Sequence, residues 1–118
     1  PKHRVWKRYY AEHEGEAGPA DVEAFADALP EAKIVLLNCM GGELSITCRH
    51  KNVYGEMASF EPFDVKEALA NLPGDQLLFG SHTPLYYTTA ALWKLERAEL
   101  DADLLAKIHS GNAAKLYC

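Results

Sequence analysis

The chain has 118 residues, a formal net charge of −5 and 48% hydrophobic residues, enough for the core of one ordinary domain. The negative charge argues against a nucleic-acid partner, because phosphate binding requires a concentrated positive field. The sequence has no apolar run near the roughly 20 residues of a membrane span and no basic-then-apolar signal peptide. We therefore expect a cytoplasmic protein without a membrane partner.

The first eighteen residues form a separate region by composition. Basic and aromatic residues alternate over positions 3–10, and an acidic run over 12–16 offsets their charge. We expect residues 1–18 to be an irregular or edge-strand segment and residues 19–118 to form a single domain. The three cysteines, at 39, 48 and 118, lack the close spacing of a zinc knuckle or a disulfide framework. Cys39 and Cys48 are expected to be buried as small hydrophobes.

Helical and strand patterns alternate from residue 19 onward. Apolar residues at helical spacing predict a helix that ends at Pro30, and unbroken apolar runs predict buried strands. The expected strands are 33–38, 52–58 and 76–81, and the expected helices are 20–29, 64–72, 87–98 and 101–110, with a last short turn from Asn112. This alternation predicts an α/β fold of parallel βα units with right-handed crossovers.

Polar side chains follow the predicted strands at their carboxyl ends, where parallel α/β sheets place their sites. Asn38 follows the strand at 33–38, and Ser81, His82 and Thr83 follow the strand at 76–81. An unperturbed imidazole titrates near pH 6.5, so His82 could bind a metal or transfer a proton. The alternative is that Ser81 and Thr83 cap the next helix and His82 is an ordinary loop histidine.

Glu56 stands within the predicted strand at 52–58. Strand residues alternate between faces, so its carboxylate points either into a barrel lumen near the site or outward. A glutamate in a dry lumen could act as an acid, whereas a solvated or paired glutamate would only serve structure.

Two motifs carry a resemblance to a known family. The sequence Leu-Phe-Gly-Ser-His-Thr-Pro at 78–84 and the ending Gly-Asn-Ala-Ala-Lys-Leu at 111–116 resemble the last strand and C-terminus of amidohydrolase-related (β/α)8 barrels. The branch that it resembles most contains the metal-dependent hydrolases and decarboxylases similar to aminocarboxymuconate semialdehyde decarboxylase. The resemblance implies that segments 34–37, 52–59 and 76–80 are the sixth, seventh and eighth strands of such a barrel, its C-terminal portion.

The resemblance also implies a divalent metal, with zinc as the first choice, but the sequence departs from the family pattern. His82 stands where the family carries an aspartate, Asn38 stands where a histidine is common, and the family's His-x-His pair has no counterpart. Catalytic zinc uses about three protein ligands plus water. The chain supplies one imidazole at this edge, so a protein without a metal remains the alternative.

Two functions follow from these observations. In the first, the chain is a metal-dependent hydrolase or decarboxylase, or a fragment of one, that acts on a small organic substrate at the mouth of the barrel. His82 and Glu56 would then be catalytic, with His82 also a metal ligand, and Asn38, Ser81 and Thr83 would bind substrate. In the second, the chain is a non-catalytic small-ligand-binding module that has lost the metal site.

The open edges of the predicted sheet bear on assembly. Three parallel strands leave unpaired backbone groups at both edges, and such edges are normally covered. We expect another copy of the chain, in a homo-oligomer, or the missing half of a barrel to cover them.

Overall fold

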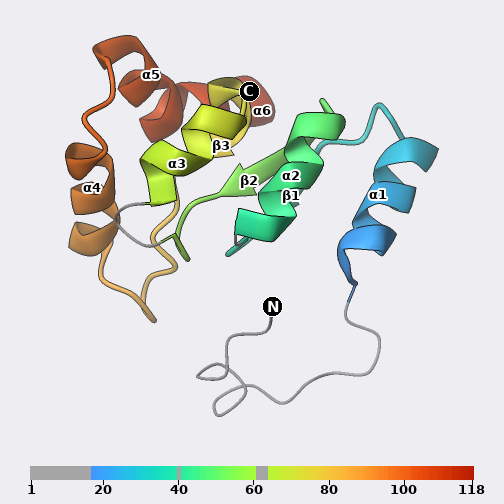
Figure 1. Cartoon of the computed structure of the whole chain (residues 1–118), viewed down its shortest axis with the longest axis horizontal. Helices are drawn as coiled ribbons and strands as arrows, with labels where there is room; N and C mark the ends of the chain where they lie inside the picture. Colours follow the sequence, from blue (N-terminus) through green and yellow to red (C-terminus); the bar gives the residue numbers. More distant parts are fainter. Residues whose placement is uncertain (1–16, 40, 61–63) are drawn as a thin grey trace.

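The computed structural model describes residues 17–39, 41–60 and 64–118 and contains one three-stranded sheet with helices around it (Figure 1). Helix α1 lies at one end of the molecule and α4 and α5 lie at the other, with the sheet between them. The elements, in chain order, are α1 (Pro19–Ala28), β1 (Ile34–Leu36), α2 (Gly41–Arg49), β2 (Val53–Glu56), α3 (Asp64–Asn71), the 3-10 turn η2 (Gly74–Gln76), β3 (Leu77–Leu78), α4 (Thr88–Arg97), α5 (Ala102–Ala106), the π-helical segment η3 (Lys107–Gly111) and α6 (Asn112–Tyr117).

The sheet is parallel throughout, with the strand order β1-β2-β3. Ile34 is aligned with Val53, and Gly55 is aligned with Leu77. All three strands therefore end at the same edge, and their following loops carry the polar residues named above. The predicted fold class of parallel βα units is confirmed, and the arrangement is compatible with part of a barrel.

Three details of the predicted fold are wrong. A helix, α2, follows β1, although the sequence analysis placed none there. Strand β3 is only two residues long, because Gly74–Gln76 forms a 3-10 turn before it. The last helix does not close at Gly111, because α5, η3 and α6 follow one another directly and only the helix type changes. A π-helical turn inside an α-helix accommodates an extra residue without ending it.

Two buried amides close the amino-terminal edge of the sheet. Gln76 Nε2 donates to the backbone carbonyls of Thr47, His50 and Val53 at 2.9, 2.8 and 2.6 Å. Asn112 Nδ2 donates to the carbonyls of Gly74 and Leu77 at 2.7 and 2.8 Å. These bonds join α2, β2, β3 and α6 and explain the asparagine of the Gly-Asn-Ala motif as a structural clamp.

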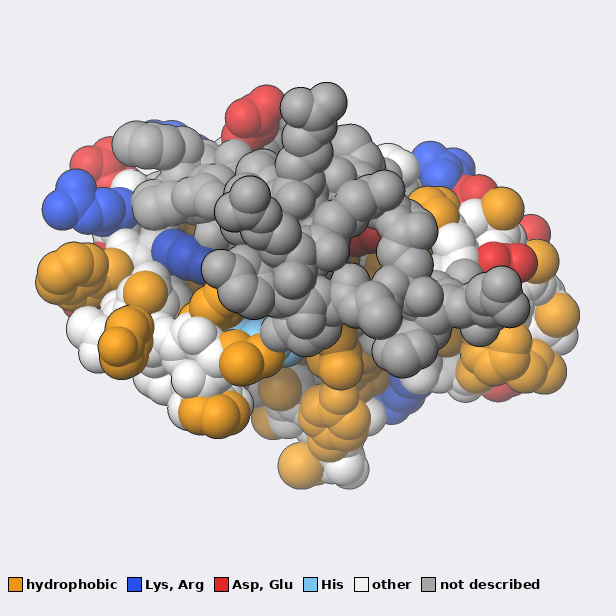
Figure 2. All heavy atoms as spheres, turned by 90° about the horizontal axis from the view of Figure 1, so that it is seen from below, with side chains coloured by type: hydrophobic (Ala, Val, Ile, Leu, Met, Phe, Trp, Pro, Cys, Tyr) orange, Lys and Arg blue, Asp and Glu red, His pale blue; other side chains and the backbone are white. Residues whose placement is uncertain are grey.

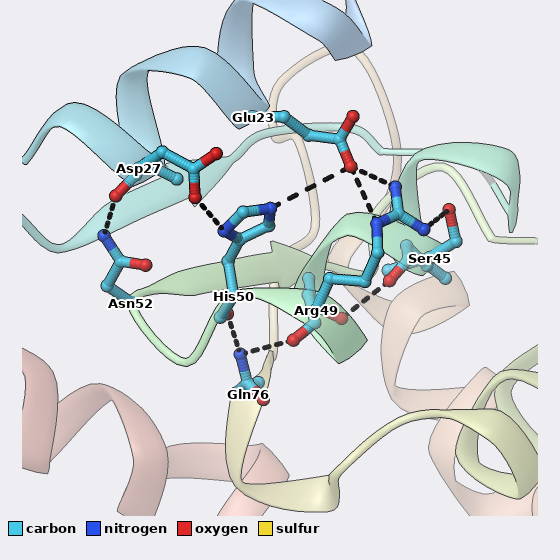
Figure 3. A network of polar contacts seen from close by, with 10 residues as sticks. Glu23, Asp27, Ser45, Arg49, His50, Asn52 and Gln76 are labelled. Carbon is cyan, nitrogen blue, oxygen red and sulfur yellow. Dashed lines mark hydrogen bonds and ion pairs between the residues drawn. The ribbon is translucent and has the colours of Figure 1, made fainter. Parts of the chain in front are cut away.

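A network of charged side chains attaches α1 to the end of α2 (Figure 3). Arg49 Nε donates to Glu23 Oε1 at 2.7 Å, and His50 Nδ1 lies 3.4 Å from Asp27 Oδ1. Asn52 Nδ2 donates to the carbonyls that end α1, those of residues 26 and 29. Arg49 and His50, at the end of α2, therefore both contact carboxylates of α1.

The core lies between the sheet and its helices in two clusters. The larger one contains the buried Met57, Leu77 and Ile108, and the smaller one contains Ala26, Ile46 and Val53. The three residues of β1 are only partly buried, whereas Val53, Gly55 and Glu56 of β2 are buried. β2 is thus the central strand. Within the described residues, none of the helices is long and apolar enough to cross a membrane.

Candidate functional site

The candidate site lies where the three strands end. Asn38 follows β1, Glu56 is the last residue of β2, and the segment from Gly80 to Thr83 follows β3. Asn38 and His82 both have left-handed backbone conformations, with φ of 52° and 51°. Asparagine and histidine tolerate this region better than most residues, and non-glycine residues held there tend to gather at functional sites.

Glu56 is 8% exposed and is bonded to the backbone on both sides. Its Oε2 accepts the Asn38 N–H at 3.0 Å, and its Oε1 accepts the Ala58 N–H at 2.6 Å. The backbone carbonyl of Glu56 accepts the thiol hydrogen of Cys39 at 3.3 Å. The side chain therefore points inward, and it binds backbone donors from the loops that follow β1 and β2.

Gly80 brings the loop after β3 to the same carboxylate. A Cβ atom built on Gly80 would lie 1.6 Å from Glu56 Oε1 and 2.1 Å from its Cδ. No side chain can occupy this position while the carboxylate stays in place. The glycine of the Phe-Gly-Ser motif is therefore required by a close approach of backbone and side chain.

Ser81, His82 and Thr83 form a second group beyond Gly80. Thr83 Oγ1 lies 2.9 Å from Ser81 Oγ and 2.7 Å from the hydroxyl oxygen of Thr88 at the start of α4. The His82 ring is partly exposed and lies against Tyr86, with 5.3 Å between ring centroids. The hydroxyls thus hold the loop onto α4.

The structure brings Asn38 and Glu56 together by a hydrogen bond, and it brings Ser81 and Thr83 together by another. The two groups are joined through Gly80, which packs on Glu56 and precedes Ser81. That His82 itself lies within reach of Asn38 or Glu56 stays a prediction. Asn38 Oδ1 is buried and has no hydrogen-bond partner within the described residues.

Cys39 lies beside Glu56 and is 1% exposed. Burial raises the pKa of its thiol to about 12, so the thiol stays protonated at neutral pH and is not a nucleophile. This agrees with its expected role as a small buried hydrophobe. Cys48, for which the same role was expected, is exposed, so that expectation was wrong.

The donor set does not fit a metal ion. Within the described ranges, no group of three His, Cys, Asp or Glu side chains could hold one. Both Glu56 oxygens already accept backbone N–H groups, and the Cys39 thiol is protonated. His82 is the remaining metal ligand predicted from the sequence, and one imidazole falls short of the three protein ligands of a catalytic zinc.

Several large hydrophobic side chains are exposed near this edge. Leu37 follows β1, Leu85 and Tyr87 lie in the loop before α4, and Trp93 lies on α4; their exposed fractions range from 59 to 85%. Seen from below the view of Figure 1, hydrophobic side chains lie at several places on the surface, together with a histidine (Figure 2).

Sequence reasoning missed two contributors to the site. Gly80 was treated only as a strand end, although a glycine within a strand pattern often marks a close backbone approach. Lys94 of α4 was not considered; its ammonium donates to the Ala58 carbonyl at 2.7 Å. Nothing in the sequence signals this contact, because its acceptor is backbone.

Comparisons with known proteins give one finding. A family model described as amidohydrolase matches residues 13–118, which is most of the chain and includes β1, β2, β3 and all the candidate site residues. The curated proteins and the solved structures contain no match to the chain. Members of this superfamily typically use divalent metals. The extent of the match, which includes both motifs at 78–84 and 111–116, shows that the chain belongs to the amidohydrolase family.

Proposed function

We propose that the chain hydrolyses or decarboxylates a small organic substrate at the carboxyl edge of its sheet, with His82 as general acid or base. The family supports a hydrolase-type function at the level of the superfamily. The observation that carries the proposal is the position of His82. It follows β3 at this edge, its ring is partly exposed beside Tyr86, and an imidazole can exchange a proton near neutral pH.

Asn38 supports a role in binding the substrate. Its N–H is held by Glu56, while its Oδ1 is a buried acceptor without a partner within the described residues. A buried acceptor without a donor costs about 1–3 kcal/mol. An N–H or O–H group of a substrate that reached this oxygen would recover that free energy. Ser81 and Thr83, which follow Gly80 in the chain, supply hydroxyls.

A second function, a small-ligand-binding module without turnover, is favoured by the donor set. Among the described residues no group of three His, Cys, Asp or Glu side chains could hold a metal, and both oxygens of Glu56 accept backbone N–H groups. Any divalent metal, zinc included, would need ligands in addition to His82. We therefore assign proton transfer to His82 alone and derive no step through a metal.

Replacing His82 with asparagine tests the proposed role. Small amides, lactones and carboxylic acids would be screened for turnover by liquid chromatography and mass spectrometry. General acid–base catalysis contributes about 10²–10⁴-fold, so we expect kcat of the best substrate to fall by a factor in this range. The matched control is His109→Asn, because the exposed His109 stacks on Phe79 outside the site.

The control should keep kcat within about twofold, as expected when no proton-transferring group is removed. Full activity in His82→Asn would contradict the role of His82. Binding of a screened compound to the wild type without turnover would instead identify the chain as the ligand-binding module.

We also propose that the chain assembles through the β1 edge of its sheet. The outer edge of β3 is already covered, because the Phe79 N–H donates to the Ile108 carbonyl and Asn112 donates to Leu77. β1 has no strand partner on its outer side within the described residues, and its side chains are only partly buried. An open apolar edge of this kind is a template for pairing.

One open edge limits the assembly that copies of this chain can form. When two copies pair β1 with β1 around a two-fold axis, each copy covers the open edge strand of the other. A larger assembly would need a second open edge strand in each copy. Sedimentation velocity at low micromolar concentration should therefore give a species of twice the 13.1 kDa chain mass. A cooperatively melting monomer would contradict the proposal, and so would an open series of larger species.

A further inference from the structure

We infer that Glu56 is a positioning residue: its carboxylate sets the conformation of the loops that carry Asn38 and His82, and it does so through backbone contacts. The inference rests on the proposed function, because these two side chains are the ones to be positioned. It differs from the catalytic role expected of Glu56 from the sequence.

The Glu56 carboxylate contacts the loops after all three described strands. Oε2 holds the Asn38 N–H after β1, and Oε1 holds the Ala58 N–H after β2. The same carboxylate rests on the backbone of Gly80 after β3. Each of the three described strands therefore sends a loop onto this single group.

Both hydrogen bonds to the Glu56 carboxylate come from backbone donors. A carboxylate is an acceptor on both oxygens, and both donors here are backbone N–H groups. Backbone donors have no freedom to rotate away, so the bonds constrain the loops themselves. The Asn38 N–H belongs to a residue with a left-handed conformation, which needs such support.

The contact extends to α4 through Ala58. The Ala58 N–H donates to Glu56, and its carbonyl accepts from Lys94 Nζ at 2.7 Å. The Thr83–Thr88 contact attaches α4 to the loop of His82 as well. His82 is thus fixed from two sides: through Gly80 by the carboxylate and through Thr83 by α4.

Glu56→Gln is the variant that tests this role with the least change in shape. An amide has one acceptor oxygen and one NH₂ group, so it can accept from Asn38 or from Ala58 but not from both. The N–H group of either Asn38 or Ala58 therefore loses its acceptor and faces the NH₂ group of the introduced glutamine. The control Glu31→Gln removes the same charge from an exposed side chain.

The measurement is nuclear magnetic resonance of the ¹⁵N-labelled chain, which needs no substrate. In Glu56→Gln, amide hydrogen exchange at residues 38 and 58, whose N–H groups bond to the carboxylate, should become about tenfold faster, the equivalent of about 1.4 kcal/mol, and the backbone amide shifts of residues 80–83 should move. The ring-proton shifts of His82 should move at fixed pH. Glu31→Gln should change neither readout.

Gln76→Ala separates positioning from a general loss of stability, since Gln76 makes its hydrogen bonds at the amino-terminal ends of the strands, away from Glu56. This variant should leave the His82 ring signals in place. Equal shifts of those signals in Gln76→Ala and Glu56→Gln would overturn the inference, as would unchanged backbone amide shifts at residues 80–83 in Glu56→Gln. Should Glu56→Gln not fold, Glu56→Asp keeps the charge but draws the oxygens back from the two N–H groups, and it is read in the same way.

The outcomes also separate this inference from the proposed function. A chain that turns over no substrate but shows the local exchange pattern supports the positioning role and contradicts the catalytic proposal. A chain whose turnover depends on His82, but whose signals at residues 80–83 do not change in Glu56→Gln, supports the catalytic proposal and contradicts the positioning role.

Discussion

Replacing Gly80 with alanine is expected to lower the free energy of unfolding by about 3–5 kcal/mol, near the upper end for a single substitution. The new Cβ would lie 1.6 Å from Glu56 Oε1, so the carboxylate must leave its place. Its bonds to the Asn38 and Ala58 N–H groups would be lost at the same time. Chemical denaturation followed by circular dichroism measures the change.

Gly111→Ala is the matched control for this prediction. Gly111 has a φ of −61° at a helical position, and its nearest neighbour to a new Cβ is the Ala106 carbonyl oxygen at 3.4 Å. Alanine here fits without a severe contact and is expected to change stability by less than about 1 kcal/mol. A small effect at both positions would contradict the close approach of Gly80 and Glu56.

Replacing Asn112 with aspartate is expected to have a comparable effect, about 3–5 kcal/mol at pH 7, because a buried charge would lack a partner. Asn112 is 2% exposed, and its Nδ2 donates to the carbonyls of Gly74 and Leu77. Aspartate has nearly the same shape but presents a negative oxygen to those two carbonyl oxygens. Thermal and chemical denaturation would measure the loss.

The pH dependence of this variant has a definite sign. Burial beside two carbonyls disfavours the charged form, so the pKa of the introduced carboxyl rises in the folded state. Stability is then highest below the ordinary aspartate pKa of about 3.9 and is lost as pH rises. The deficit relative to wild type should therefore be smaller at pH 4 than at pH 7. The reference is Gln76→Ala, which removes a buried amide without introducing a charge, so its deficit should not change between pH 4 and pH 7.

Hydrophobic periodicity predicted the parallel sheet and most helices, but α2 was missed. Its sequence, Gly-Gly-Glu-Leu-Ser-Ile-Thr-Cys-Arg, is poor in strong helix formers. The helix is stabilised by packing, because Leu44, Ile46 and Thr47 are buried. Tertiary contacts of this kind override local propensity and cannot be recognised from the residues alone.

The ends of the last strand and helix were also misplaced for physical reasons. β3 is short because its neighbours on the amino side form a 3-10 turn, and Phe79 bonds to η3 instead of to a further strand. The helix continues past Gly111 because Asn112 is held inside it by bonds to Gly74 and Leu77. Both effects depend on residues far apart in the sequence.

The site could be predicted only in part. Asn38 follows β1 and Ser81, His82 and Thr83 follow β3, as the order of polar residues after apolar runs indicated, but their roles in a site stay predictions. The contacts of Glu56 could not be predicted, since its partners are backbone N–H groups at residues 38 and 58. Backbone donors are present at nearly every residue and leave no pattern in the sequence.

A double-mutant cycle between Glu56→Ala and Gly80→Ala tests most directly the central claim that the three strand ends meet on one carboxylate. Removal of the carboxylate vacates the space that the alanine Cβ needs, so the double variant should be no less stable than Glu56→Ala alone. The coupling free energy would then be about 3 kcal/mol, near the upper limit for residues in contact. Additive losses in the two single variants would show that Glu56 and Gly80 do not touch and would contradict the account.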